Sequence, residues 1–145
     1  MFDASALAKR YAVEPGRERV MDLFAQATEV SVSAHCASEI AYALLRRRRD
    51  GSLLNSEFDR ALEAAQHDLA DMVLVPVDKQ VERFALAMME NAPLPVLDAL
   101  QVGSALASGV DLFVTASRRQ AQAARALGLK TECLEPQAGP VAVSL

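Results

Sequence analysis

The stretch PLPVLDALQVGSALASGVDLFVT, residues 93–115, holds a helix signal that is followed at once by a strand signal. Apolar residues recur at helical spacing from Leu94 to Leu106. The run DLFVT, residues 111–115, then has the continuous apolar character of a buried strand. A helix that leads into an apolar strand is part of the unit from which parallel α/β sheets are built.

The same alternation of helix and strand signals continues along the rest of the chain. Because strands separated by helices require crossover connections, the pattern predicts an α/β fold with a parallel sheet covered on both faces. The run MVLVPV, residues 72–77, is expected to be another buried strand. The remaining strand signals lie at residues 29–33 and 129–134, and the remaining helix signals at residues 5–12, 17–27, 37–49, 56–69, 81–90 and 118–127.

Length and composition indicate one globular domain. The chain has 145 residues, 52% of them hydrophobic, and contains no internal repeat or interior linker. We expect a single domain over residues 1–134 and a tail over residues 135–145. No apolar run reaches the roughly 18 residues of a membrane span, and no secretory signal is present, so no membrane role is expected. Two cysteines are a weak basis for a disulfide framework, and they favour a cytoplasmic protein with reduced thiols.

Asp98 is an anomaly in the helix of the opening stretch, because it stands among the apolar residues of the stripe. Burying a lone ionised carboxylate is strongly unfavourable, so such a group must be neutral, paired or bound to a metal. The alternative is an Asp98 that points to a groove and bonds an arginine or a backbone N–H. The sequence around Asp98 leaves both interpretations open.

Glu39 and Asp3 raise the same question. Glu39 lies among apolar residues in HCASEIAYALL, although an acid in the first turn of a helix is also favoured by the helix dipole. Asp3 follows only Met1 and Phe2, and it could simply cap the next helix. A central strand normally needs about four residues or more. Either the first strand is therefore very short, or residues are missing upstream.

The three acids together suggest a metal site. In open parallel α/β sheets, ligands bind beyond the C-terminal ends of the strands, where Asp3 would lie. Carboxylates brought there by two helices could gather around a hard cation such as Mg²⁺ or Mn²⁺. The cation would remove the burial cost that Asp3, Glu39 and Asp98 each carry separately.

Four motifs in this order resemble PIN domains, and most closely the VapC-like ribonuclease toxins of type II toxin–antitoxin systems. The resemblance runs from residue 2 to about residue 132. It implies a three-layer α/β/α sandwich with a mostly parallel central sheet. It also implies a Mg²⁺- or Mn²⁺-dependent endoribonuclease that acts on RNA, forms homodimers and is held by a VapB-like antitoxin. The motifs are FDASALAKRY, ASEIAYALLRR, LDALQVGSALA and LFVTASRRQAQAARALGL.

The resemblance assigns roles to individual residues of this chain. Asp3, Glu39 and Asp98 match the first three metal-binding acids of the family. Ser5 matches the hydroxyl residue that supports the first acid, and Thr115 matches the threonine that precedes the fourth acid.

Two positions depart from the family pattern. Ser117 occupies the place of the fourth acid, and a hydroxyl there supplies no charge, so cation binding should be weaker. Gln101 stands where many relatives have a histidine; it can form hydrogen bonds but cannot titrate. These departures keep open a second function, in which a weakened or inactive PIN domain binds RNA or an antitoxin without cutting.

Basic clusters are candidates for RNA contacts, although the formal net charge of −4 gives no general argument for nucleic-acid binding. Arg118 and Arg119 follow the expected strand end and could bind phosphates, or they could simply be solvated. Lys9 and Arg10 are similar but weaker candidates. The run Arg46–Arg49 could balance a helix dipole or meet RNA or an acidic antitoxin segment.

Other chemistries fit the sequence poorly. Zinc sites need clustered Cys and His, and the two residues of each type are mostly far apart. The chain has no P-loop, no dinucleotide-binding glycine motif and no G-x-S-x-G elbow. A phosphatase or phosphotransferase of another doubly wound fold could also use an Asp after its first strand. The second and third acids, on helices, fit a PIN site better.

Overall fold

A computed structural model describes residues 1–134 of the chain. The tail expected at residues 135–145 lies outside the described residues. Within them, no helix is long and apolar enough to cross a membrane.

The helices and strands follow the predicted order, and the strands are shorter than predicted. The helices are α1 (Ala4–Leu7), the 3-10 helix η1 (Ala8–Arg10), α2 (Arg17–Gln26), α3 (Cys36–Arg49), α4 (Asn55–Ala70), α5 (Lys79–Asn91), α6 (Val96–Ser108) and α7 (Arg118–Ala126). The strands are β1 (Ser31–Ser33), β2 (Val73–Val75), β3 (Phe113–Thr115) and β4 (Thr131–Cys133).

The start of the chain joins two pairs of parallel strands. β1 pairs with β2, and β3 pairs with β4. Between these pairs, the backbone N–H of Phe2 donates to Ser31 of β1 at 3.2 Å, and that of Asp3 donates to Val114 of β3 at 2.9 Å. Residues 1–3 thus act as a very short first strand, and the order across the sheet is β2, β1, residues 1–3, β3, β4.

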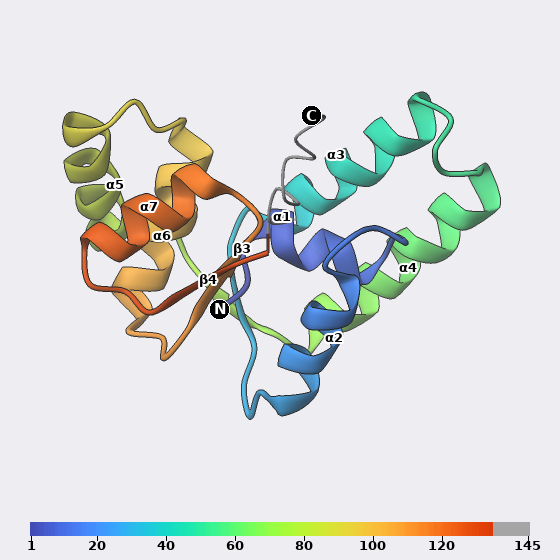
Figure 1. Ribbon diagram of the computed structural model, residues 1–145, viewed down its shortest axis with the longest axis horizontal. Coiled ribbons are helices and arrows are strands. Elements are labelled where there is room, and N and C mark those ends of the chain that lie inside the picture. The colour runs from blue at the N-terminus through green and yellow to red at the C-terminus, as the bar shows by residue number, and fades with distance from the viewer. Residues whose placement is uncertain (135–145) are drawn as a thin grey trace, which may run out of the picture.

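Helices cover both faces of this sheet, as predicted. Figure 1 shows α5, α6 and α7 on one side of the strands and α1 to α4 on the other. One apolar core contains Leu7, Ile40 and Leu44, and a second contains Val102 and Phe113. The predicted α/β fold with a parallel, covered sheet is therefore confirmed.

The packing of α6 on α5 is very close at Gly103. A Cβ atom at this glycine would lie 2.9 Å from the backbone oxygen of Val81. The absence of a side chain lets the backbones of α5 and α6 approach each other, which fixes the helix that carries Asp98.

One burial prediction is wrong. The run at residues 72–77 was expected to be buried, but Val73 and Leu74 of β2 are 45% and 59% exposed, and Val77 is 38% exposed. Among the strands of residues 1–134, β2 pairs with β1 alone and lies at the edge of the sheet. An edge strand leaves part of its apolar surface open. By contrast, β3 lies inside the sheet and is fully buried, as predicted.

Candidate active site

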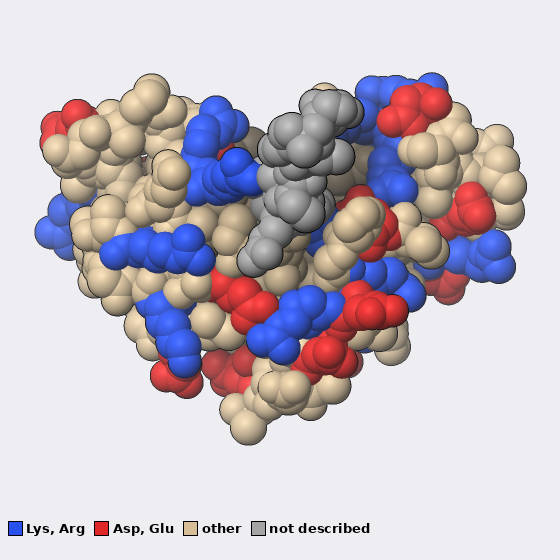
Figure 2. All heavy atoms as spheres, in the orientation of Figure 1, with Lys and Arg blue, Asp and Glu red and all other residues tan. Residues whose placement is uncertain are grey.

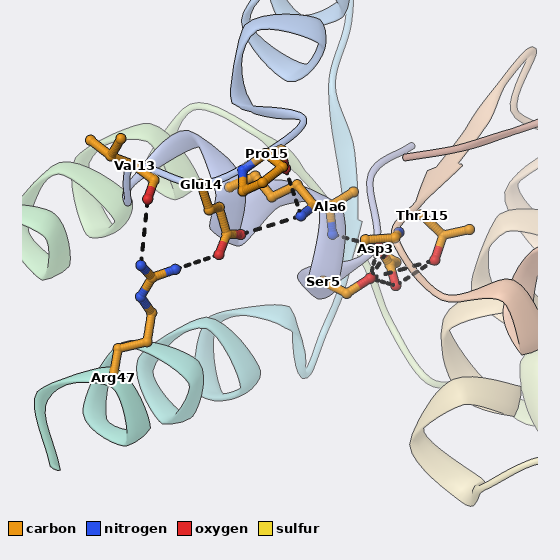
Figure 3. Close-up of polar contacts among 10 residues, drawn as sticks. Asp3, Ser5, Ala6, Val13, Glu14, Pro15, Arg47 and Thr115 are labelled. Carbon is orange, nitrogen blue, oxygen red and sulfur yellow. Dashed lines mark hydrogen bonds and ion pairs between the residues drawn. The ribbon is translucent and has the colours of Figure 1, made fainter. Parts of the chain in front are cut away.

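Asp3 lies at the C-terminal end of the short first strand, where its carboxylate is almost completely buried. Its Oδ1 accepts hydrogen bonds from the backbone N–H of Ala6 at 2.8 Å and from the Ser5 hydroxyl at 2.9 Å. Its Oδ2 accepts from Ser5 at 2.7 Å and from Thr115 at 2.9 Å. Asp3 therefore caps α1, and Ser5 and Thr115 support it as the resemblance implies. Figure 3 shows these three side chains grouped together.

The pKa of Asp3 is raised to about 6, chiefly because burial disfavours the charged carboxylate. The hydrogen bonds from Ala6, Ser5 and Thr115 oppose this shift, whereas the nearby charge of Glu39 adds to it. A buried carboxylate with this environment is suited to a cation partner, because a cation would stabilise its ionised form.

The loop after β3 is tied to the same group. The backbone N–H of Ala116 donates to the Ser5 hydroxyl at 3.0 Å, and that of Ser117 donates to Oγ1 of Thr115 at 3.0 Å. The Ser117 hydroxyl accepts from the backbone N–H of Gln120 at 3.3 Å and thereby caps α7. Ser117 thus lies at the place expected for the fourth acid, but its side chain serves as a helix cap.

Glu39 lies in the first turn of α3 and is partly buried. Its Oε2 accepts a hydrogen bond from the side-chain amide of Gln101 at 2.5 Å, and it lies 3.5 Å from Nε2 of His35. Burial raises the pKa of Glu39, the bond from Gln101 lowers it, and the charge of Asp98 raises it. Gln101 is buried, and its carbonyl oxygen accepts from the Ser33 hydroxyl at the end of β1 at 3.1 Å.

Asp98 lies in the first turn of α6, at the rim of the apolar face and not within it. Its side chain is 20% exposed, and its neighbour Leu97, expected on the buried stripe, is 48% exposed. Its Oδ1 accepts from the side-chain amide of Gln120 at 3.0 Å, and Nη2 of Arg119 lies 3.7 Å from Oδ2. The arginine contact was one of the two alternatives for Asp98.

Gln120 is the residue of this site that the sequence interpretation missed. It is only 4% exposed, and its carbonyl oxygen lies 3.4 Å from Oγ1 of Thr115. The sequence pattern that could have identified Gln120 is its position on the small apolar face of α7, next to Ala121 and Ala124. The structure buries all three side chains. Each of the two helix acids thus accepts a hydrogen bond from a buried glutamine amide. The Gln101 carbonyl oxygen accepts from Ser33, whereas the Thr115 hydroxyl near Gln120 donates chiefly to Asp3.

Lys9 and Arg10 do not contact the acids. The Lys9 ammonium donates to the backbone oxygen of Pro15 at 2.9 Å and lies 3.5 Å from Glu14. The Arg10 guanidinium donates to Asp68 at 2.7 Å and also stacks over the ring of Phe24. Both cations are therefore occupied within the fold, whereas Arg118 and Arg119 start α7 next to the site.

The three acids fit a hard divalent cation by their chemistry. Asp3, Glu39 and Asp98 supply carboxylate oxygens. Burial is the main cause of the raised pKa values of Asp3 and Glu39; the charge of Glu39 adds to the shift of Asp3, and that of Asp98 to the shift of Glu39. Within residues 1–134, however, no three His, Cys, Asp or Glu side chains lie close enough together to hold an ion. The carboxylates would therefore have to move together around a cation.

The chain belongs to the PIN domain family, since a family model for the PIN domain matches residues 1–126. Among solved structures, it resembles VapC20 of Mycobacterium tuberculosis, described as a toxin that cleaves the sarcin–ricin loop. The TM-score is 0.66 at 18% sequence identity, and the match covers 84% of this chain and 92% of that chain. This likeness supports the fold. A comparison with curated protein sequences found no significant match.

Proposed function

We propose that this PIN domain is a divalent-metal-dependent endoribonuclease of the VapC-like toxin type. The observation that carries the proposal is the position of the three acids: Asp3 ends the first strand, and Glu39 and Asp98 lie in the first turns of α3 and α6. Ligands of parallel α/β sheets bind beyond the C-terminal ends of the strands. Membership of the PIN family and the likeness to VapC20 are consistent with it.

Asp3, Glu39 and Asp98 would hold Mg²⁺ or Mn²⁺. When bound, the cation would supply Lewis-acid activation of water and polarise the scissile phosphate. Ser5 and Thr115 keep the Asp3 carboxylate in place through hydrogen bonds to both of its oxygens. In-line attack by water would leave a 3′-hydroxyl and a 5′-phosphate on the two RNA products.

Arg118 and Arg119 are the proposed phosphate-binding residues. Arg119 already lies beside Asp98, so an RNA phosphate at the acids would be within the range of its guanidinium. A cytoplasmic location, a homodimer and a VapB-like antitoxin partner belong to the same proposal. In it, the antitoxin would block the site until it is removed.

Cleavage of RNA by the purified chain, free of any antitoxin, tests this proposal. We expect Mg²⁺- or Mn²⁺-dependent cleavage that EDTA abolishes and that Asp98→Asn reduces at least about 100-fold, since it removes a ligand charge. Asp111→Asn is the matched control, because Asp111 is an exposed acid outside the site. Equal cleavage by the parent chain and Asp98→Asn would refute the assignment.

One observation favours the alternative of a non-cutting binding module. Ser117 supplies no charge at the fourth position, and its hydroxyl is used to cap α7. Calorimetric titration with Mn²⁺ separates the two functions. Binding only at millimolar metal, without RNA cleavage, would support the binding module, whereas tighter binding with cleavage would support the nuclease.

A further inference from the structure

The four consecutive arginines at the end of α3 divide into two kinds. The Arg47 guanidinium pairs with Glu14, and the Arg48 guanidinium lies 4.2 Å from the ring centre of Phe58. Both guanidinium groups therefore contact other parts of the fold and stabilise the position of α3. Arg46 and Arg49 are exposed, and within residues 1–134 neither makes a hydrogen bond or a close ion pair. Hydrogen bonds from Ser52 lower the pKa of Asp50, the residue that follows α3, and the charge of Arg47 and then that of Arg46 add to this shift.

The two unpaired arginines lie on the helix face that begins at the proposed metal ligand Glu39. Glu39, Tyr42, Arg46 and Arg49 are three, four and three positions apart, a spacing that places side chains on one side of a helix. The opposite side of α3 faces the core through buried residues such as Leu44. The Tyr42 ring, between Glu39 and Arg46, is 60% exposed.

A cavity lies between Arg46 of this face and Ser5 of the site. It has a volume of about 270 Å³, and its lining includes Ser5, Arg46 and Arg47 together with the carboxylates of Glu14 and Asp50. Ser5 is the hydroxyl that bonds Asp3. Figure 2 shows Lys and Arg atoms at the upper right, over the C-terminal end of α3, and a second group over the start of α7.

We propose that Tyr42, Arg46 and Arg49 form a binding track for single-stranded RNA, with Tyr42 stacking on a base and the two arginines contacting phosphates. The inference rests on the proposed ribonuclease function and names where its substrate lies. Three carboxylates on one side of the sheet repel a polyanion, so cations further along the helix face that carries Glu39 would help to hold it. Proteins bind single-stranded nucleic acids through exposed aromatic rings that stack on bases and nearby guanidinium groups that contact phosphates.

Binding of a fluorescently labelled single-stranded RNA, measured by anisotropy in EDTA, tests the track without cleavage. We expect the double variant Arg46→Ala/Arg49→Ala to bind at least about 10-fold more weakly. Its plot of log affinity against log salt should be shallower by about 1.4, for two lost phosphate contacts. We expect Tyr42→Ala to bind about 5-fold or more weakly, while Tyr42→Phe keeps its ring and binds as the parent does.

A matched control removes two cations elsewhere. Lys79→Ala/Arg83→Ala acts on an exposed face of α5, and its loss of affinity should be much smaller. Equal losses in the two double variants, or parental binding by Tyr42→Ala, would overturn the track. So would a double variant that loses binding to polyglutamate but keeps RNA binding, because the surface would then fit an acidic protein.

Failure of the track and failure of the nuclease can be distinguished. RNA that binds in EDTA through Tyr42, Arg46 and Arg49 but is never cut with Mg²⁺ would support the track and refute the nuclease. Cleavage by the parent chain, with unchanged RNA binding in all these variants, would support the nuclease and refute the track. Arg47 and Arg48 remain intact in every variant, so the contacts that hold α3 are retained.

Discussion

The side-chain amide of Gln120 donates a hydrogen bond of 3.0 Å to Oδ1 of Asp98. The carbonyl oxygen of the same amide lies 3.4 Å from the Thr115 hydroxyl, which also donates to Asp3. One buried residue of α7 thereby contacts both Asp98 and the threonine that holds Asp3. Because the amide is neutral, it orients the Asp98 carboxylate without cancelling the charge that a cation needs.

We expect Gln120→Leu to weaken Mn²⁺ binding about 10- to 100-fold, because loss of a residue that orients a ligand typically has this effect. Isothermal titration calorimetry would measure it. Gln122→Leu is the control, since Gln122 is exposed on the same helix. Unchanged Mn²⁺ affinity in Gln120→Leu, with an unchanged melting temperature, would show that the hydrogen bond does not position Asp98.

The buried Asp3 should make the stability of the metal-free protein depend on pH. Its pKa is about 6 in the folded chain against an ordinary 3.8, so the folded state binds the proton more tightly. The resulting stabilisation, about 3 kcal/mol, is complete below pH 3.8 and is lost as the pH rises through about 6.

Urea unfolding in EDTA at several pH values between 4 and 7.5 would test this, with Asp3→Asn as the reference. Asparagine does not titrate. The free energy of unfolding of the parent chain, relative to Asp3→Asn, should therefore rise as the pH falls. Parallel profiles for the two proteins would contradict the expected behaviour of Asp3.

Ser117→Asp should strengthen cation binding and cleavage, because it restores a negative charge at the fourth position. The substitution should not cost α7 its cap, since Asp caps helices as well as Ser does. Cleavage and Mn²⁺ affinity would be compared across metal concentrations. Ser117→Asn isolates the charge, because it can also cap. If Ser117→Asn improves cleavage as much as Ser117→Asp, charge is not the cause.

Gly103→Ala should destabilise the fold, because the new Cβ would lie 2.9 Å from the backbone oxygen of Val81. Overpacking of this kind costs about 1–3 kcal/mol, and the better helix propensity of alanine offsets only about 1 kcal/mol. Chemical denaturation would measure the change. A more stable variant would mean that α5 and α6 separate easily at this point.

Much of the fold could be predicted from the sequence because hydrophobic spacing is a local property. The helix and strand order and the parallel sheet follow from it, whereas Asp98, expected within the apolar stripe of its helix, lies at the rim of that face. The exposure of Val73 and Leu74 could not be predicted, because an apolar run does not reveal whether its strand is central or at an edge.

The partners of the acids were beyond sequence reasoning because they are distant along the chain. Gln101 is 62 positions from Glu39, and Gln120 is 22 positions from Asp98. The same holds for Arg10, a weaker candidate for an RNA contact, which pairs with Asp68, 58 positions away. Its role as an RNA contact remains a prediction, now with a competing partner inside the fold.

The short first strand also affects when the protein can function during its synthesis. The backbone of Asp3 is held by Val114 of β3, and its neighbour Phe2 is held by Ser31 of β1. A growing chain therefore lacks a fixed first carboxylate until most of the described residues have left the ribosome and β3 has paired with residues 1–3. In the proposed nuclease, the capacity to cut RNA would arise only with this late, long-range contact.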